Sequence, residues 1–85
     1  MRQSMKTRAD VAGAVREAIG QILPGVPPGE VTGDRHLRDL GADSVDRVEI
    51  ILGAQDRLGL AEPLSTFADL RDIDALVDVL WERAS

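Results

Sequence analysis

The segment LRDLGADSVDRVEI, residues 37–50, leads from a loop into a helix. Gly41 allows the chain to turn sharply into that helix. Asp43 and Asp46 have the three-residue spacing of a capping box, in which side chains accept hydrogen bonds from the first backbone N–H groups. Ser44 therefore falls in the first turn, where the free N–H groups and the helix dipole favour an anion such as a phosphate ester.

Three longer segments and one short segment carry the apolar spacing of helices. They cover residues 7–23, 44–58, 66–70 and 73–83. No segment alternates apolar and polar residues as a half-buried strand would. The sequence therefore predicts an all-α fold, a small four-helix bundle of three main helices and one short helix. We expect one domain over residues 1–85, with a frayed start at residues 1–6.

Residues suited to helix ends stand where these segments begin and end. Ser65 is predicted to cap the short helix and Asp72 the last one, while Gly59 ends the helix that begins at Ser44. The predicted inward side chains are Val11, Ala14, Val15, Ala18, Ile19, Ile22, Leu23, Ile50, Ile51, Ala54, Leu58, Ile73, Leu76, Val77 and Leu80. Gly53 has two open interpretations, either close packing between helices or room for an acyl chain.

The first loop, residues 24–43, is unusually long for so small a chain. It contains three of the four prolines and four of the eight glycines, so it forms neither a regular helix nor a central strand. Loops of this length usually have a function. We expect its apolar side chains to hold it against the core, and a short helical turn is predicted over residues 36–39. These side chains are Val26, Val31, Leu37 and Leu40.

Composition excludes several classes of protein. The 85 residues contain no cysteine, which removes a disulfide framework, a thiolate zinc site and a thiol nucleophile. The net charge of -5 and the two aromatic residues, Phe67 and Trp81, argue against nucleic-acid binding. No apolar run approaches the roughly 20 residues of a membrane span, and the N-terminus lacks the apolar core of a signal peptide. We expect a cytoplasmic monomer.

The acidic charge lies in the second half of the chain. Residues 1–38 have a net charge of +2, and residues 39–85 have a net charge of -7. A basic partner would be attracted to the second half. The acids near Ser44 do not have the spacing of a calcium loop, so no metal site is predicted.

The run Leu40-Gly41-Ala42-Asp43-Ser44, continued by Asp46 and Val48-Glu49-Ile50, resembles the prosthetic-group site of acyl carrier proteins. The resemblance covers roughly residues 11–80, including the helix order, the long first loop and the proline before the short helix. It implies that Ser44 receives 4'-phosphopantetheine from coenzyme A and that acyl groups travel as thioesters on this arm. The arm would supply the thiol that the cysteine-free chain lacks.

The same resemblance implies that partner enzymes dock on the helix that follows Ser44. The candidate recognition residues combine apolar contacts with acids: Asp39, Asp43, Val45, Asp46, Arg47, Val48 and Glu49. We expect Val45 to be exposed and Val48 partly so. Arg47, together with Gln55 at a position where carriers often have an acid, departs from a purely acidic docking face. Mixed charge of this kind can encode partner choice by repulsion as well as attraction.

The expected partners are a phosphopantetheinyl transferase, an acyltransferase, and a ketosynthase or an HMG-CoA-synthase-like enzyme. Asp43 before the serine resembles acyl more than peptidyl carriers, and Met1 near the first helix predicts a freestanding carrier. The chain resembles carriers of bacterial polyketide pathways, in particular donor carriers of β-branching cassettes. A fatty-acid synthase carrier is the alternative within the family.

Two other classes compete with a carrier. One is an unmodified helical interaction module with the same fold. The other is a hydrolase built on Ser44, which would need a base and an oxyanion site. The single histidine, His36, lies in the loop, and the Gly-x-Ser-x-Gly pattern of a nucleophile elbow is absent. We therefore predict no catalytic residue and no enzyme activity.

Overall fold

The computed structural model describes residues 7–70 and 72–84. The α-helices are α1 (Arg8–Ile22), α2 (Ser44–Leu58) and α3 (Ile73–Ala84). The 3-10 segments are η1 (Pro28–Glu30), η2 (Leu37–Leu40) and η3 (Leu64–Phe67). No strand occurs in the described ranges, so the predicted all-α fold is confirmed. The predicted frayed start, residues 1–6, lies outside the described residues.

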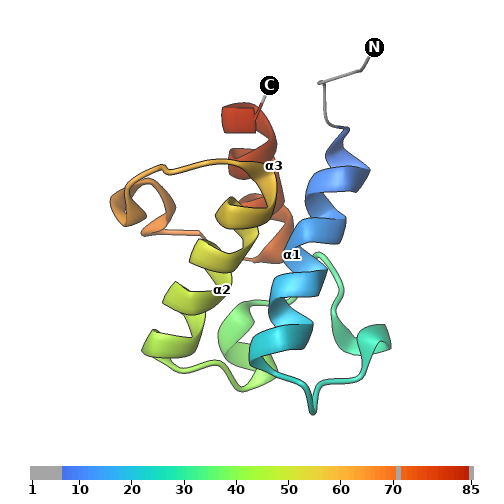
Figure 1. The fold of residues 1–85 in the computed structure, drawn as a ribbon. Coiled ribbons are helices and arrows are strands. Elements are labelled where there is room, and N and C mark those ends of the chain that lie inside the picture. The colour runs from blue at the N-terminus through green and yellow to red at the C-terminus, as the bar shows by residue number, and fades with distance from the viewer. Residues whose placement is uncertain (1–6, 71, 85) are drawn as a thin grey trace.

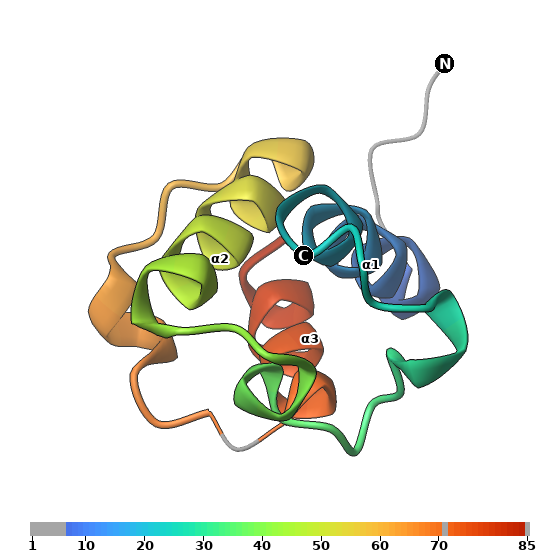
Figure 2. The ribbon, with the colours of Figure 1, turned by 90° about the horizontal axis from the view of Figure 1, so that it is seen from below.

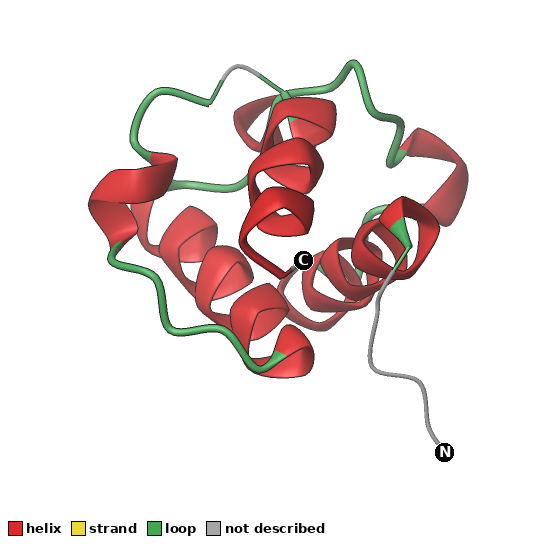
Figure 3. Ribbon diagram, turned by 90° about the horizontal axis from the view of Figure 1, so that it is seen from above, coloured by secondary structure: helices red, strands yellow, loops and turns green. Residues whose placement is uncertain are grey.

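Helix α1 packs against both other helices. Figure 1 shows α1 and α2 side by side, with the first loop passing below them to reach the start of α2. The view from below, in Figure 2, shows α3 lying between α1 and α2, and the three helices share one core. Figure 3 shows that loops and short helical turns form the periphery of the bundle. None of the described helices combines the length and apolar character needed to cross a membrane.

Local capping sets the ends of α2 and α3 as predicted. Asp72 Oδ1 accepts the Ala75 N–H at 2.8 Å, which caps the start of α3. Gly59 ends α2 with a φ of 70°, a left-handed conformation in which a side chain is strained. These interactions are short-range in sequence, which is why a sequence pattern was able to predict them.

The short fourth helix differs from the prediction. It is the 3-10 segment η3, and it begins at Leu64, two residues earlier than expected. Ser65 lies inside it and does not cap it, so that prediction was wrong. The extended backbone of Pro63 starts the segment, and the Thr66 N–H closes the turn on the Pro63 carbonyl at 3.0 Å.

The core is made of the predicted apolar side chains, with a few displaced to its edge. Ile22, Leu23 and Ile51 are half-buried and pack against the core, whereas the other predicted inward residues are buried. The first loop packs against the core as expected, through buried Val31, Leu37 and Leu40 and half-buried Val26. A loop fixed in this way places the start of α2 at a defined position.

The first loop also binds the start of α3 through its backbone. The Asp74 N–H donates to the Gly33 carbonyl at 2.8 Å, and the Ile73 N–H donates to the Arg35 carbonyl at 2.9 Å. A Cβ at Gly33 would collide with the Asp74 carboxylate, so a larger residue there would force this exposed side chain to move. The contact satisfies N–H groups that a helix start otherwise leaves unpaired.

Two exposed arginines connect the helices. Arg8 on α1 binds Asp78 of α3 at 2.8 Å, and hydrogen bonding to that carboxylate raises the pKa of Arg8. Arg57 on α2 forms an ion pair with Glu17 of α1 at 3.4 Å and donates to Gln21 Oε1 at 2.6 Å. Exposed pairs of this kind each contribute about 0.2–1 kcal/mol, so the apolar core, and not these bonds, determines the fold.

Candidate functional site

The segment before α2 is fixed by a capping box of its own. His36 Nδ1 accepts the Arg38 N–H at 2.9 Å, and Asp39 Oδ2 accepts the His36 N–H at 3.2 Å. Gly41 then adopts a φ of 96°, which is why a glycine is needed there. The next residue, Ala42, is buried. This arrangement anchors the chain one residue before the cap of α2.

The first turn of α2 leaves Ser44 accessible. Asp43 Oδ1 accepts the Asp46 N–H at 2.8 Å, and Asp46 Oδ2 accepts the Asp43 N–H at 3.3 Å, so the predicted capping box is confirmed. Ser44 is exposed. Among the described residues, neither its hydroxyl nor the N–H groups of Ser44 and Val45 form a hydrogen bond. Unpaired donors at a helix start suit a phosphate ester.

Capping occupies three of the four acids that were predicted to recognise partners. The carboxylates of Asp39, Asp43 and Asp46 each accept a backbone N–H. Glu49 is exposed, and no interaction with another described residue involves its carboxylate. For Asp39 the sequence did hold a signal, because Asp39 follows His36 by the three residues of a capping box. Glu49 is therefore the acid among these four whose carboxylate has no capping role, and exposed Asp56 further along α2 is free of such a role as well.

Exposed apolar side chains form a line along α2, which we call the docking face: Val45, Val48 and Leu52. They are 65%, 37% and 49% exposed, and their spacing of three and four residues puts them on one side of the helix. The exposure of Val45 and Val48 agrees with expectation. Sequence reasoning missed Leu52, although its distance of seven residues from Val45 is the signal for the same side.

Gln55 does not belong to the docking face. It is buried, and its amide donates to the Glu62 carbonyl at 3.2 Å. The Glu62 N–H donates back to Gln55 Oε1 at 2.5 Å. The interpretation of Gln55 as a departure from an acidic docking face was wrong. Its side chain is buried and forms hydrogen bonds with the backbone of Glu62, in the segment that follows α2.

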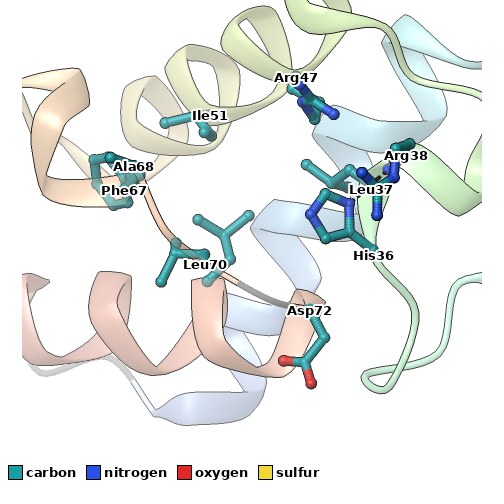
Figure 4. Close-up of a pocket in the computed structure, with 10 residues that line it drawn as sticks. His36, Leu37, Arg38, Arg47, Ile51, Phe67, Ala68, Leu70 and Asp72 are labelled. Atoms are coloured by element: carbon teal, nitrogen blue, oxygen red, sulfur yellow. Dashed lines mark hydrogen bonds between the residues drawn. The ribbon is translucent and has the colours of Figure 1, made fainter.

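A second side of α2, which we call the cavity face, carries Ser44, Arg47 and Ile51 at the same spacing. Arg47 and Ile51 line a cavity of about 230 Å3. Its other walls come from η2, from the segment after α2 and from α3 (Figure 4): His36, Leu37, Arg38, Phe67, Ala68, Leu70, Asp72 and Leu76. Arg47, a predicted recognition residue, thus turns to the cavity, while Val45, next to Ser44, turns to solvent.

Gly53 supports helix packing and not cargo space. A Cβ at Gly53 would lie 3.3 Å from Arg57 Nη1 and 3.5 Å from the Ala18 Cβ, so Gly53 faces α1, and neither Gly53 nor Ala54 lines the cavity. Of the two interpretations left open by the sequence, close packing of α1 and α2 is the one that this geometry favours.

The chain is similar to known carriers. Residues 13–80 match the family described as phosphopantetheine attachment site. Over 72 residues the chain is 32% identical to an acyl carrier protein of Thermobifida fusca (strain YX), which covers 84% of this chain and 90% of that one. No solved structure matches.

Other relatives are longer proteins. The chain is 41% identical over 54 residues to acyl carrier protein 2, chloroplastic, of Hordeum vulgare, which covers 60% of this chain and 42% of the relative. It is 33% identical over 63 residues to the non-reducing polyketide synthase ausA of Aspergillus calidoustus, with 74% of this chain and 2% of the synthase covered. The chain therefore spans less than half the length of these two relatives. The family match and the Thermobifida relative place this chain among the acyl carrier proteins, which carry a covalently attached 4'-phosphopantetheine and are carriers, not catalysts.

Proposed function

We propose that Ser44 is the residue that bears 4'-phosphopantetheine and that acyl groups are carried as thioesters on this arm. The observation that supports the assignment is an exposed hydroxyl in the first turn of α2, with no competing hydrogen bond among the described residues. The unpaired N–H groups of Ser44 and Val45 suit the phosphodiester. Ser65, an exposed serine in η3, lacks a helix long enough to offer a comparable dipole.

The attachment reaction needs a partner enzyme. The bond from Ser44 Oγ to phosphorus forms, the pyrophosphate bond of coenzyme A breaks, and adenosine 3',5'-bisphosphate leaves. A base must accept the hydroxyl proton, and the single histidine of the sequence, His36, uses Nδ1 to cap η2. A phosphopantetheinyl transferase supplies the missing base, while this chain supplies an oriented hydroxyl on a rigid helix. When bound, the arm provides a thiol for thioester chemistry.

The test is an intact-mass measurement after incubation with coenzyme A and a broad-specificity phosphopantetheinyl transferase. We expect the wild type to gain one phosphopantetheinyl group. Ser44→Ala should gain none, whereas the matched control Ser65→Ala should be modified as the wild type is. A gain that persists in Ser44→Ala contradicts the assignment. If several transferases leave the wild type unmodified, the unmodified interaction module becomes the better explanation.

For the pathway we propose bacterial polyketide biosynthesis, with the β-branching donor role as its most specific form. The support is the sequence resemblance of residues 43–50 and 67–80 to such carriers, and a polyketide synthase among the relatives. Relatives named acyl carrier protein favour the fatty-acid alternative. Loaded carrier should transfer its acyl group to an HMG-CoA-synthase-like enzyme faster than to fatty-acid synthase enzymes. The reverse order of rates would identify a fatty-acid carrier.

A further inference from the structure

Two arginines and a histidine gather at one end of the cavity described above. Figure 4 shows Arg47, Arg38 and His36 at this end, with Phe67 and Ala68 at the other. Between them the wall is apolar and is formed by Ile51 and Leu70, among others. A cavity with an apolar wall and cations at one end is suited to a ligand with a short hydrocarbon part and an anionic end.

These arginines differ from most others in the protein by having no counter-ion. The guanidinium groups of Arg8, Arg35, Arg57 and Arg83 each pair with a carboxylate. Within residues 7–70 and 72–84, no ion pair or side-chain hydrogen bond involves the guanidinium of Arg38 or Arg47. Arg47 is nevertheless half-buried. Their charge is thus available to a ligand.

One carboxylate also borders the cavity. Asp72 lines it, and Figure 4 shows this side chain on the side opposite Arg47. Its Oδ1 already accepts the Ala75 N–H at 2.8 Å. An anionic ligand would be repelled from the Asp72 side and attracted to Arg47 and Arg38, so the arrangement favours one orientation of the ligand.

The cavity is within reach of the attachment residue proposed above. Ser44 and Arg47 are three residues apart, and Ile51 follows Arg47 by four, so all three lie on the cavity face of α2. The volume of about 230 Å3 is about half as large again as the roughly 150 Å3 engineered cavity that holds benzene. It has room for a short acyl group and not for a long fatty chain.

We propose that this carrier selects short acyl groups that end in a carboxylate, which pairs with the guanidinium groups of Arg47 and Arg38. The methylenes of such a group pack against Ile51 and Leu70. The inference rests on the proposed attachment at Ser44 and adds the chemical class of the cargo. No bond is made or broken in the cavity, since the interaction is an ion pair together with apolar contact.

The first test compares two cargoes of the same size. A transferase loads the chain from glutaryl-coenzyme A or from 5-oxohexanoyl-coenzyme A. These acyl groups have equal numbers of non-hydrogen atoms. The glutaryl group ends in a carboxylate, whereas the 5-oxohexanoyl group ends in an uncharged methyl ketone. The rate of thioester hydrolysis is measured and divided by that of the free pantetheine thioester. We expect about two- to fivefold slower hydrolysis of the glutaryl carrier, and loss of this protection near 1 M salt.

Variants then assign the protection to the two arginines. Arg47→Gln and Arg38→Gln should each reduce it. Arg16→Gln is the matched control, because Arg16 is exposed on α1, has no ion pair among the described residues and does not line this cavity. The proposal is overturned if both cargoes hydrolyse at equal normalised rates, or if Arg16→Gln reduces the protection as much as Arg47→Gln does.

A second measurement does not depend on attachment. Glutaryl-pantetheine and 5-oxohexanoyl-pantetheine are titrated at millimolar concentration into the unmodified chain, and the NMR shifts of the Arg47, Ile51 and Leu70 amides are followed. Larger shifts with glutaryl-pantetheine are expected, and equal or absent shifts contradict the cargo class. Intact mass reports separately whether Ser44 was modified, so failure of attachment and failure of cargo selection are distinguishable.

Discussion

The docking face and the cavity face of α2 differ by a rotation of about 100°, which is one residue of a helix. On the docking face, Val45 and Leu52 are apolar and exposed, whereas on the cavity face Arg47 is charged and half-buried. This reverses the usual relation between polarity and burial. Helix α2 thus presents two different sides next to Ser44, an apolar side that meets solvent and a charged side that borders a cavity.

The largest expected effect is on the free energy of unfolding, and it distinguishes a core residue of α2 from a residue of the docking face. Ile50 is fully buried, so Ile50→Ala should lower the free energy of unfolding by about 2–5 kcal/mol. Leu52→Ala, on the docking face, should lower it by about 0.5 kcal/mol or less. Urea denaturation measures both. Similar costs for the two variants would mean that Leu52 is part of the core and that the docking face has been drawn wrongly.

The next effect concerns Asp43, which caps the start of α2, where the docking face and the cavity face both begin. Asp43→Ala removes the hydrogen bond to the Asp46 N–H and should cost about 1 kcal/mol of unfolding free energy. The loosened first turn should also slow the modification of Ser44. Asp43→Asn keeps an acceptor and should recover most of the stability in the same denaturation experiment. An Asn variant as unstable as the Ala variant would show that charge, and not the cap bond, is what matters.

A smaller effect tests the docking face alone. Glu49→Lys should slow loading by the transferase about threefold at low salt, because its charge attracts a basic partner. Glu49 makes a cleaner test than Asp46, whose carboxylate also caps α2. The control is Glu82→Lys, an exposed acid on α3. Loading rates that fall equally in both variants would indicate a general charge effect and no defined docking face.

The smallest effect lies in the loop, away from both faces. The Thr32 hydroxyl donates to Asp34 Oδ1 at 2.6 Å and lowers the pKa of Asp34. A lowered native pKa stabilises the fold above the unfolded pKa, and this contribution disappears as the pH falls through the native value. The stability difference between wild type and Thr32→Val should therefore shrink in acid. If the stability difference does not depend on pH, the hydrogen bond to Asp34 is not its cause. Loading of Ser44 at neutral pH should be unchanged in Thr32→Val.

The parts that were predictable depend on residues close together in the chain. Asp43 caps α2 because Asp46 is three residues away, and Gly59 ends the helix through its own backbone conformation. The exposure of Val45 follows from helical spacing. The start of η3 was missed because Pro63 acts through its backbone, whereas Ser65, two residues later, has the side chain typical of an N-cap but lies inside the segment.

The parts that were not predictable depend on contacts between distant segments. Whether Arg47 faces solvent or a cavity is decided by where η2 and the segment near Leu70 pack against α2. The burial of Gln55 likewise depends on the path of the chain at Glu62. Helical spacing assigns a residue to a side of a helix, but only the neighbouring elements determine what covers that side.

The sequence by itself determined the helices, their caps and the place of Ser44 in the first turn of α2, since hydrogen bonds over three or four residues settle these features. Only the tertiary structure decided that one side of α2 meets solvent and the next borders a cavity. It also brought Arg38 and Arg47 to the same end of that cavity. The physical reason is that such a cavity forms between packed elements, and their packing follows from burial summed over the whole core.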